Sequence, residues 1–209
     1  MARNNLCRIV AATQNAGKII ELREILKDFA CEVVPISDVA PEYDVAEDGR
    51  TYAENALKKA RAAAALAGTL AIADDSGLEV DALAGAPGLY SARFGGERLP
   101  QAEKNKLLLQ QLQGCSQRSA RFRCVIAVAS PAGDAATTEG VCEGLIGLEA
   151  RGRGGFGYDP LFIVPEYGQT MAELEPAVKN MISHRAKALA NLRRILPRFF
   201  AAPIFENFR

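Results

Sequence analysis

The stretch LAIADDSGL, residues 70–78, places two adjacent aspartates directly after a short apolar run. We expect the run to form a buried strand that ends in a turn at Ser76 and Gly77, since Asp, Ser and Gly are common turn residues. Neighbouring side chains of a strand point to opposite faces, so Asp74 and Asp75 should have different roles. Carboxylates beside a core are costly unless a cation such as Mg²⁺ takes their oxygens as ligands. A strand-to-turn corner with no role in binding is the alternative interpretation.

Strand and helix patterns follow one another on both sides of this stretch. They predict an α/β protein in which helices pack on a long sheet. Strands are expected at residues 6–12, 31–35, 70–75, 79–83 and 161–164, and within 120–148, which a hairpin at 131–134 divides. Helices are expected from the polar loop 13–18 to about residue 29, and at 51–67, 101–113 and 183–199.

The composition limits the class of protein. Lysine plus arginine equals aspartate plus glutamate at 25 each, so the chain lacks the basic excess of a protein that grips a nucleic acid backbone. The five cysteines are widely spaced and form no C-x-x-C pair, which supports neither a zinc site nor a disulfide framework. No apolar run reaches membrane-spanning length. We therefore expect a cytoplasmic globular protein that binds neither nucleic acid nor membrane.

The loop TQNAGK, residues 13–18, joins the first strand to the first helix. Lys18 in the opening turn of that helix opposes the helix dipole, and a bound anion would reverse the penalty. The loop is not a Walker A motif, because Ala12 stands at the first glycine position and Ile19 replaces the Ser or Thr. The alternative is a plain connection in which Asn15 caps the helix.

Two further segments carry residues suited to binding. In GGFGYDP, residues 154–160, glycines flank an aromatic ring that could stack on a base, or that could simply fill the core. In SHR, residues 183–185, Ser183 is a good N-cap, so the donors of His184 and Arg185 should be free in the first helical turn. With Lys179 they would form a donor-rich patch able to read carbonyl oxygens.

Together these segments resemble the inosine triphosphate pyrophosphatase family, the non-canonical purine nucleotide pyrophosphatases. The tracts that carry the resemblance span nearly the whole chain: TQNAGK (13–18), ENA (54–56), ADDSGL (73–78), GAPG (85–88), SAR (91–93), FGYDP (156–160) and SHR (183–185). Each tract is weak alone, whereas all of them in this order are specific. Gln14 is a small departure, because relatives often have Gly there.

The resemblance implies Mg²⁺-dependent hydrolysis of inosine, deoxyinosine and xanthosine triphosphates to the monophosphate plus diphosphate, by a homodimer. It implies a single domain, residues 1–209, with a long central mixed β-sheet flanked by helices and two lobes around a substrate cleft. Asp75 would be the proton acceptor and a metal ligand. The implied triphosphate contacts are Thr13, Gln14, Asn15, Ala16, Gly17, Lys18 and Ser76. The implied base contacts are Phe156, Gly157, Tyr158, Asp159, Lys179, His184 and Arg185.

Two questions stay open at the level of sequence. Either Glu47 or Glu54 could complete the metal shell, and we favour Glu47 because it lies in a loop, whereas Glu54 can pair with Lys58 one turn on. Two alternative hypotheses for the function stand beside this one: a pyrophosphatase with another base preference, or a module that senses nucleotides without cleaving them. The donors of His184 and Arg185 favour a purine with a carbonyl oxygen at C6 over adenine.

Overall fold

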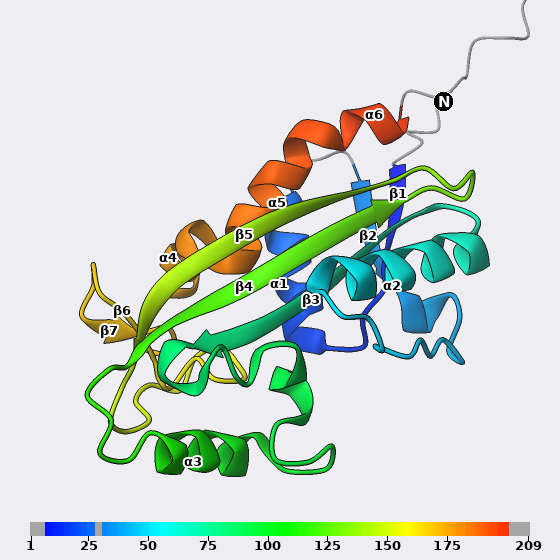
Figure 1. The fold of residues 1–209 in the computed structure, drawn as a ribbon. Helices are drawn as coiled ribbons and strands as arrows, with labels where there is room; N and C mark the ends of the chain where they lie inside the picture. Colours follow the sequence, from blue (N-terminus) through cyan, green and yellow to red (C-terminus); the bar gives the residue numbers. More distant parts are fainter. Residues whose placement is uncertain (1–6, 28–30, 201–209) are drawn as a thin grey trace, which may run out of the picture.

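The computed structural model describes residues 7–27 and 31–200, which form an α/β fold around one seven-stranded sheet (Figure 1). The strands are β1 (Cys7–Ala11), β2 (Cys31–Pro35), β3 (Leu70–Val80), β4 (Ser119–Ala129), β5 (Ala135–Ile146), β6 (Phe162–Val164) and β7 (Gln169–Thr170), in the order β2-β1-β3-β4-β5-β6-β7. Strand β1 is parallel to β2 and β3, and every other pairing is antiparallel. The predicted fold class, a mixed sheet flanked by helices, is confirmed, and its division into two lobes stays a prediction.

Most predicted helices are present, with shifted ends. The helices are α1 (Ala16–Leu26), α2 (Tyr52–Ala67), α3 (Gln101–Gln111), α4 (Pro176–Ile182), α5 (His184–Ile195) and α6 (Pro197–Phe200), and short 3₁₀ segments lie at Ile36–Asp38, Asp81–Leu83 and η3 (Gly88–Arg93). Helix α4 was not predicted, and the expected end of the first helix near Phe29 lies outside the described residues. The single helix expected over 183–199 is wrong: Pro197 opens a separate short helix, because proline fits a first helical turn and breaks a helix interior.

The sheet separates two layers of helix, as Figure 1 shows. Helix α2 packs on one face, where its alanines meet Ala71 and Ala73 of β3. Helices α1 and α5 pack on the other face, against Leu70 and Ile72. The alternation along β3 therefore carries Asp74 toward α1 and α5, and Asp75 toward α2, which confirms the prediction that the two side chains lie on opposite faces. None of the helices in the described ranges is both long and apolar enough to cross a membrane.

Strand β3 runs without interruption through the two aspartates, which corrects one expectation. We expected a turn at Ser76 and Gly77 and a separate strand at 79–83, yet β3 continues to Val80 and pairs with β4 throughout. Gly77 serves close packing here: a Cβ atom at this position would lie 2.2 Å from the carbonyl oxygen of Gly88 and 2.6 Å from Tyr52 Oη. The aspartates thus lie in the middle of a strand.

A third apolar cluster lies farther along β3 and β4. Leu78 and Phe122 pack there with Leu108 of α3 and with Phe162 of β6. Asp74, Asp75 and Ser76 lie along β3 between this cluster and the two clusters beneath the helical layers. The hairpin expected at 131–134 joins β4 to β5, and its Ser130 amide bonds to the carbonyl of Asp134.

Candidate active site

A cavity of about 400 Å³ opens over the middle of β3. The predicted site residues that line it are Asn15, Lys18, Glu47, Asp75, Ser76, Phe156, Gly157, Tyr158, Asp159, Lys179, His184 and Arg185. Segments far apart in the sequence therefore meet at one place. Thr13, Gln14, Ala16 and Gly17 complete the adjoining loop and the start of α1 without lining the cavity. Its lining also includes Gln101 and Phe122, which the sequence did not single out.

The loop before α1 is shaped by its own side chains. Asn15 is the N-cap that the sequence predicts, and its Oδ1 accepts a hydrogen bond from the Lys18 amide at 3.3 Å. Thr13 Oγ1 accepts one from the Asn15 amide at 3.2 Å, and Gln14 Nε2 donates to the carbonyl of Tyr43 at 3.3 Å. The cap occupies the Lys18 amide, so the first-turn amides that can meet an anion are those of Ala16 and Gly17.

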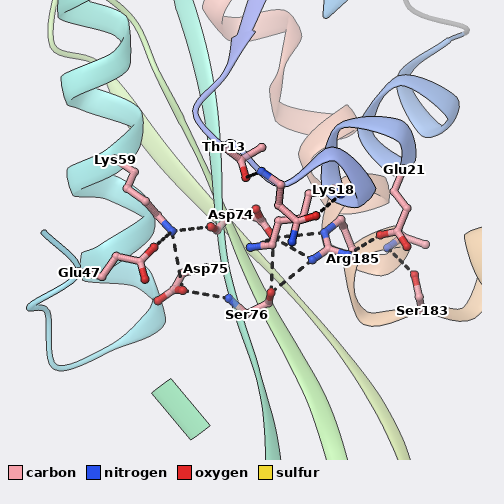
Figure 2. A network of polar contacts seen from close by, with 12 residues as sticks. Thr13, Lys18, Glu21, Glu47, Lys59, Asp74, Asp75, Ser76, Ser183 and Arg185 are labelled. Atoms are coloured by element: carbon pink, nitrogen blue, oxygen red, sulfur yellow. Dashed lines mark hydrogen bonds and ion pairs between the residues drawn. The ribbon is translucent and has the colours of Figure 1, made fainter. Parts of the chain in front are cut away.

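Asp74 forms a buried anionic centre on the α1–α5 side of the sheet (Figure 2). Its Oδ2 lies 3.0 Å from Lys18 Nζ and accepts hydrogen bonds from Arg185 Nε at 3.2 Å and Nη2 at 3.0 Å. Burial raises the pKa of Asp74, but the cations Lys18 and Arg185 outweigh it and hold the pKa well below its usual range. Asp74 is therefore an ionised carboxylate that fixes two cations.

Asp75 meets a different environment on the α2 side. Its Oδ2 accepts a hydrogen bond from Asn55 Nδ2 at 2.9 Å, and its Oδ1 accepts one from the Ser76 amide at 3.1 Å. Lys59 Nζ lies 3.8 Å from Oδ1. Burial raises the pKa of Asp75 above its usual value, and the opposing effects of Lys59 and Asn55 do not cancel it. Asp75 is thus a better proton acceptor than an ordinary aspartate.

Lys59 links Asp75 to Glu47. Its ammonium donates to Glu47 Oε1, and to the backbone carbonyl of Asp74 at 2.8 Å, as the left side of Figure 2 shows. Glu47 lines the cavity, whereas Glu54, in the first turn of α2, is exposed and accepts a hydrogen bond from the Arg50 amide at 2.6 Å. Of the two glutamates considered from sequence, only Glu47 shares a cation with Asp75.

The donor set at this end suits a magnesium ion. Magnesium in proteins commonly takes one or two carboxylates and completes its shell with water and substrate phosphates. Asp75 and Glu47 both face the cavity, and Lys59 between them marks a place where the protein already holds positive charge. Within residues 7–27 and 31–200 no cluster of three or more His, Cys, Asp or Glu side chains is arranged to hold a metal. The pair therefore fits an ion that also depends on substrate oxygens.

Arg185 and Lys179 converge on Glu21 at the other end of the cavity. Arg185 Nη1 donates to Glu21 Oε2, and Lys179 Nζ lies 2.9 Å from Glu21 Oε1 and 2.8 Å from Asp159 Oδ2. The expectation that the Arg185 donors are free is wrong, because all three of its guanidinium nitrogens already donate to neighbours. The four bonds formed within the described part of the chain leave one of the five N–H groups, on Nη1, for a ligand.

His184 lies beside this network as a neutral ring. It stacks on Phe122 with the ring centres 4.8 Å apart, and its Nδ1 has no hydrogen-bond partner among the described residues. Burial and the neighbouring Arg185 cation hold the pKa of His184 well below its ordinary value. A neutral imidazole has one donor and one acceptor nitrogen, so His184 offers a ligand a single N–H.

The Gly-rich loop and Ser91 close the cavity. Tyr158 Oη donates to the carbonyl of Ser91 at 2.9 Å, and Ser91 Oγ accepts a hydrogen bond from the Leu78 amide at 2.9 Å. The Phe156 amide donates to Asp159 Oδ2 at 2.8 Å. Lys179 Nζ lies 4.9 Å from the centre of the Phe156 ring, which is within cation–π range. The aromatic residues of this loop are thus fixed relative to β3.

Sequence reasoning missed Glu21, Asn55 and Lys59 as members of the site. Asn55 and Lys59 lie on the buried face of α2, at helical spacing from Tyr52, Ala56 and Ala63. A polar residue in an otherwise apolar stripe is the signal that could have identified both. Glu21 gives a weaker signal of this kind, as a polar residue next to the buried Leu22 on α1.

Comparison with known proteins gives matches over most of the chain. The sequence model of the Ham1 family matches residues 9–195. The dITP/XTP pyrophosphatase of Desulforamulus reducens is 56% identical over 195 residues, which are 92% of this chain and 97% of that protein. The Ham1 protein of Coxiella burnetii has a TM-score of 0.83 at 43% identity, covering 92% of this chain and 99% of that one. A nucleoside-triphosphatase, or dITP/XTP pyrophosphatase, of Mycobacterium abscessus has a TM-score of 0.71 at 40% identity, covering 88% of this chain and 98% of that one.

Proposed function

The chain belongs to the Ham1 family, and from this premise we propose that it hydrolyses deoxyinosine, inosine and xanthosine triphosphates to the monophosphate and diphosphate. The family resemblance predicted from the motifs is confirmed. One observation carries the chemistry: Asp75, buried with a raised pKa, opens onto a cavity that also presents Lys18 and the N-terminus of α1. A proton acceptor and a phosphate-binding end thus face the same space.

Asp75 is the general base of the proposed reaction. It accepts the proton of the water that attacks the α-phosphorus, and its raised pKa makes it more basic at neutral pH than an ordinary aspartate. The Asn55 amide and the Ser76 amide hold one carboxylate oxygen each, so the carboxylate stays in one orientation. Asp75 and Glu47 would hold Mg²⁺, which supplies charge neutralisation for the phosphates and lowers the pKa of a bound water.

Lys18 and the first amides of α1 bind the triphosphate and stabilise the departing diphosphate. Asp74 holds the Lys18 ammonium at the cavity edge in the substrate-free protein, so Lys18 does not have to adopt a new side-chain conformation when the substrate binds. Asn15 and Ser76 complete the polar lining at this end, and Thr13 lies next to it in the adjoining loop. The helix dipole and the lysine act in the same direction on the developing negative charge.

The base is selected at the end formed by Phe156–Asp159, Lys179, His184 and Arg185. The remaining N–H of Arg185 and the single N–H of His184 donate to the C6 carbonyl oxygen of hypoxanthine or xanthine. Adenine presents an amino group there and would leave buried donors unpaired, at a cost of about 1–3 kcal/mol each. The buried Asp74 and Glu21 hold Arg185 in place for this contact.

We further propose that the enzyme acts as a homodimer in the cytoplasm, on free nucleotides, with neither nucleic acid nor membrane as a partner. The equal numbers of acidic and basic residues support this setting, because they provide no general attraction for a polyanionic backbone. Removal of these nucleotides would cleanse the pool from which polymerases draw.

The test is a product analysis with five nucleotides. The purified protein and Mg²⁺ are incubated with inosine, deoxyinosine, xanthosine, guanosine or adenosine triphosphate, with Asp75→Asn as the inactive control. Monophosphate plus diphosphate from the first three, and none from adenosine triphosphate, is the expected result. Guanosine triphosphate has the same C6 carbonyl oxygen, so its rate relative to inosine triphosphate measures selection against the 2-amino group. Equal cleavage of all five would refute the base assignment, and tight binding without cleavage would indicate a sensor.

A further inference from the structure

Gly17, the second residue of α1, is a glycine for which the helix itself gives no reason. Its backbone does not have the positive φ that favours glycine, unlike Gly155 (φ +67°) and Gly157 (φ +64°) of the Gly-rich loop. Alanine forms a helix more readily than glycine does. The reason for a glycine at this position therefore lies in what surrounds it.

The neighbour of Gly17 is the Phe156 ring. A Cβ atom on Gly17 would lie 2.8 Å from Phe156 Cδ1, closer than real Cβ atoms pack, and 3.0 Å from Cε1, which is tight. Asn15 Oδ1 would lie at 3.2 Å, which is tight but less severe. The ring thus rests directly on the backbone of the first turn of α1.

The rest of the ring faces cations of the opposite end of the cavity. Lys179 Nζ lies 4.9 Å from the ring centre, and Arg185 Cζ lies 5.5 Å from it. The Phe156 amide is held by Asp159, so the ring has a fixed point of attachment. Phe156 therefore spans from the cations of the base end to the helix that binds phosphate.

We propose that Gly17 is a positioning residue for Phe156, and that the missing side chain sets the ring position on which affinity for the purine base depends. The inference rests on the proposed function, because it assigns the ring to the base of the same substrate. Added bulk at residue 17 would lift the ring toward Lys179 and Arg185 and displace the surface on which the base stacks. Residue 17 thus acts on base affinity from the phosphate-binding helix.

A second explanation makes a different prediction. Glycine in the first turn of a helix can let a phosphate approach the backbone closely, as in phosphate-binding loops. In that case Gly17→Ala would weaken binding of any polyphosphate, whether or not it carries a base. Inorganic tripolyphosphate, which has no base, separates the two explanations.

The experiment is a double-mutant cycle with Gly17→Ala, Phe156→Ala and the double variant. For each protein, kcat and KM for deoxyinosine triphosphate and the inhibition constant of tripolyphosphate are measured. Gly17→Ala should raise KM roughly fivefold or more, the lower end of what losing base stacking produces, with kcat changed less. In the Phe156→Ala background the same change should have no further effect on KM, and tripolyphosphate inhibition should change less than about twofold throughout.

Thermal unfolding of the same four proteins tests the packing without any substrate. Alanine at residue 17 should raise Tm in the Phe156→Ala background, where its helix propensity acts alone, and should fail to raise it when the ring is present. Additive Tm shifts, an unchanged KM in Gly17→Ala, or a parallel rise in the tripolyphosphate inhibition constant would each overturn the inference. Failure of the wild-type protein to cleave deoxyinosine triphosphate would refute the proposed function and with it the role in base affinity, while the unfolding cycle would still decide the packing.

Discussion

Asp74 and Asp75 are neighbours in β3, yet their side chains lie on opposite faces of the sheet and their pKa values are shifted in opposite directions. Asp74 lies 3.0 Å from Lys18 Nζ and has a lowered pKa, whereas Asp75 accepts from Asn55 at 2.9 Å and has a raised one. Two carboxylates whose pKa values are pushed apart are suited to two tasks. Asp74, with the lower pKa, holds cations, and Asp75, with the higher pKa, accepts a proton in the proposed reaction.

Asp75→Asn should abolish turnover without weakening the fold. Loss of a general base lowers kcat by roughly 10²–10⁴-fold. Because the folded-state pKa of Asp75 is raised, its ionised form is disfavoured in the folded protein at neutral pH, so the amide should leave Tm at pH 7 unchanged or higher. Steady-state kinetics and thermal unfolding check both effects. A variant with near-native kcat would remove Asp75 from the mechanism.

Lys59→Met should move the acid limb of the kcat/KM profile to higher pH. Activity requires the ionised form of Asp75 and falls as pH falls through its pKa. Lys59 lowers that pKa against the stronger effect of burial, so removal of the cation lets the pKa rise further. The control is Lys58→Met, an exposed neighbour that pairs with Asp48 at 2.6 Å. Identical acid limbs for the two variants would contradict this prediction.

Asp74→Asn should destabilise the protein strongly at neutral pH. It leaves the half-buried Lys18 without its carboxylate and the buried Arg185 with Glu21 as its remaining carboxylate, at a cost of roughly 3 kcal/mol, or about 6–12 °C in Tm. The folded-state pKa of Asp74 is lowered, so its stabilising effect is present above the unfolded value near 4 and is lost as pH falls through the folded value.

Unfolding measured from neutral to acid pH checks the Asp74 prediction. The difference between wild type and Asp74→Asn should narrow on acidification. Asp134→Asn, in the exposed β4–β5 hairpin, is the control and should stay within about 0.5 kcal/mol of wild type. A constant difference at all pH values would mean that the charge of Asp74 is not the source of its effect.

Glu47→Gln should weaken the binding of Mg²⁺, whereas Glu54→Gln should not. Glu47 faces the cavity and shares Lys59 with Asp75, while Glu54 lies at the surface and accepts a hydrogen bond from the Arg50 amide. We expect chelation to stop turnover in every variant, and the Mg²⁺ concentration for half-maximal rate to rise at least about tenfold in Glu47→Gln alone. Binding of Mn²⁺ by the substrate-free proteins provides a second readout. Equal shifts in both variants would refute the choice of Glu47.

The local features of this fold could be predicted from sequence. Alternation in a strand places Asp74 and Asp75 on opposite faces, Asn15 has the side chain of an N-cap, and Gly68 ends α2 in a left-handed conformation. Each of these depends on residues within one or two turns. Such features need no knowledge of the partners that are distant in sequence.

The features that sequence could not give depend on distant partners. Ser76 and Gly77 looked like a turn, because nothing nearby shows that Gly88 and Tyr52 pack against the strand there. Glu21 is an ordinary surface glutamate until Arg185 and Lys179, more than 150 residues away, close around it. The donors of Arg185 were expected to be free for the same reason. Charge pairing across the fold decides which polar residues are available to a ligand.

The uninterrupted pairing of β3 has a consequence for how the molecule opens. The strand is paired with β4 from Ala71 to Val80, and the partners of Asp74 and Asp75 are Ile126 and Val125 in the centre of that ladder. We expect the amides there to exchange with solvent deuterium only through global unfolding. Local opening of the surrounding loops would then leave the spacing of the two carboxylates unchanged, so the proposed chemistry would take place on the segment of the chain that unfolds last.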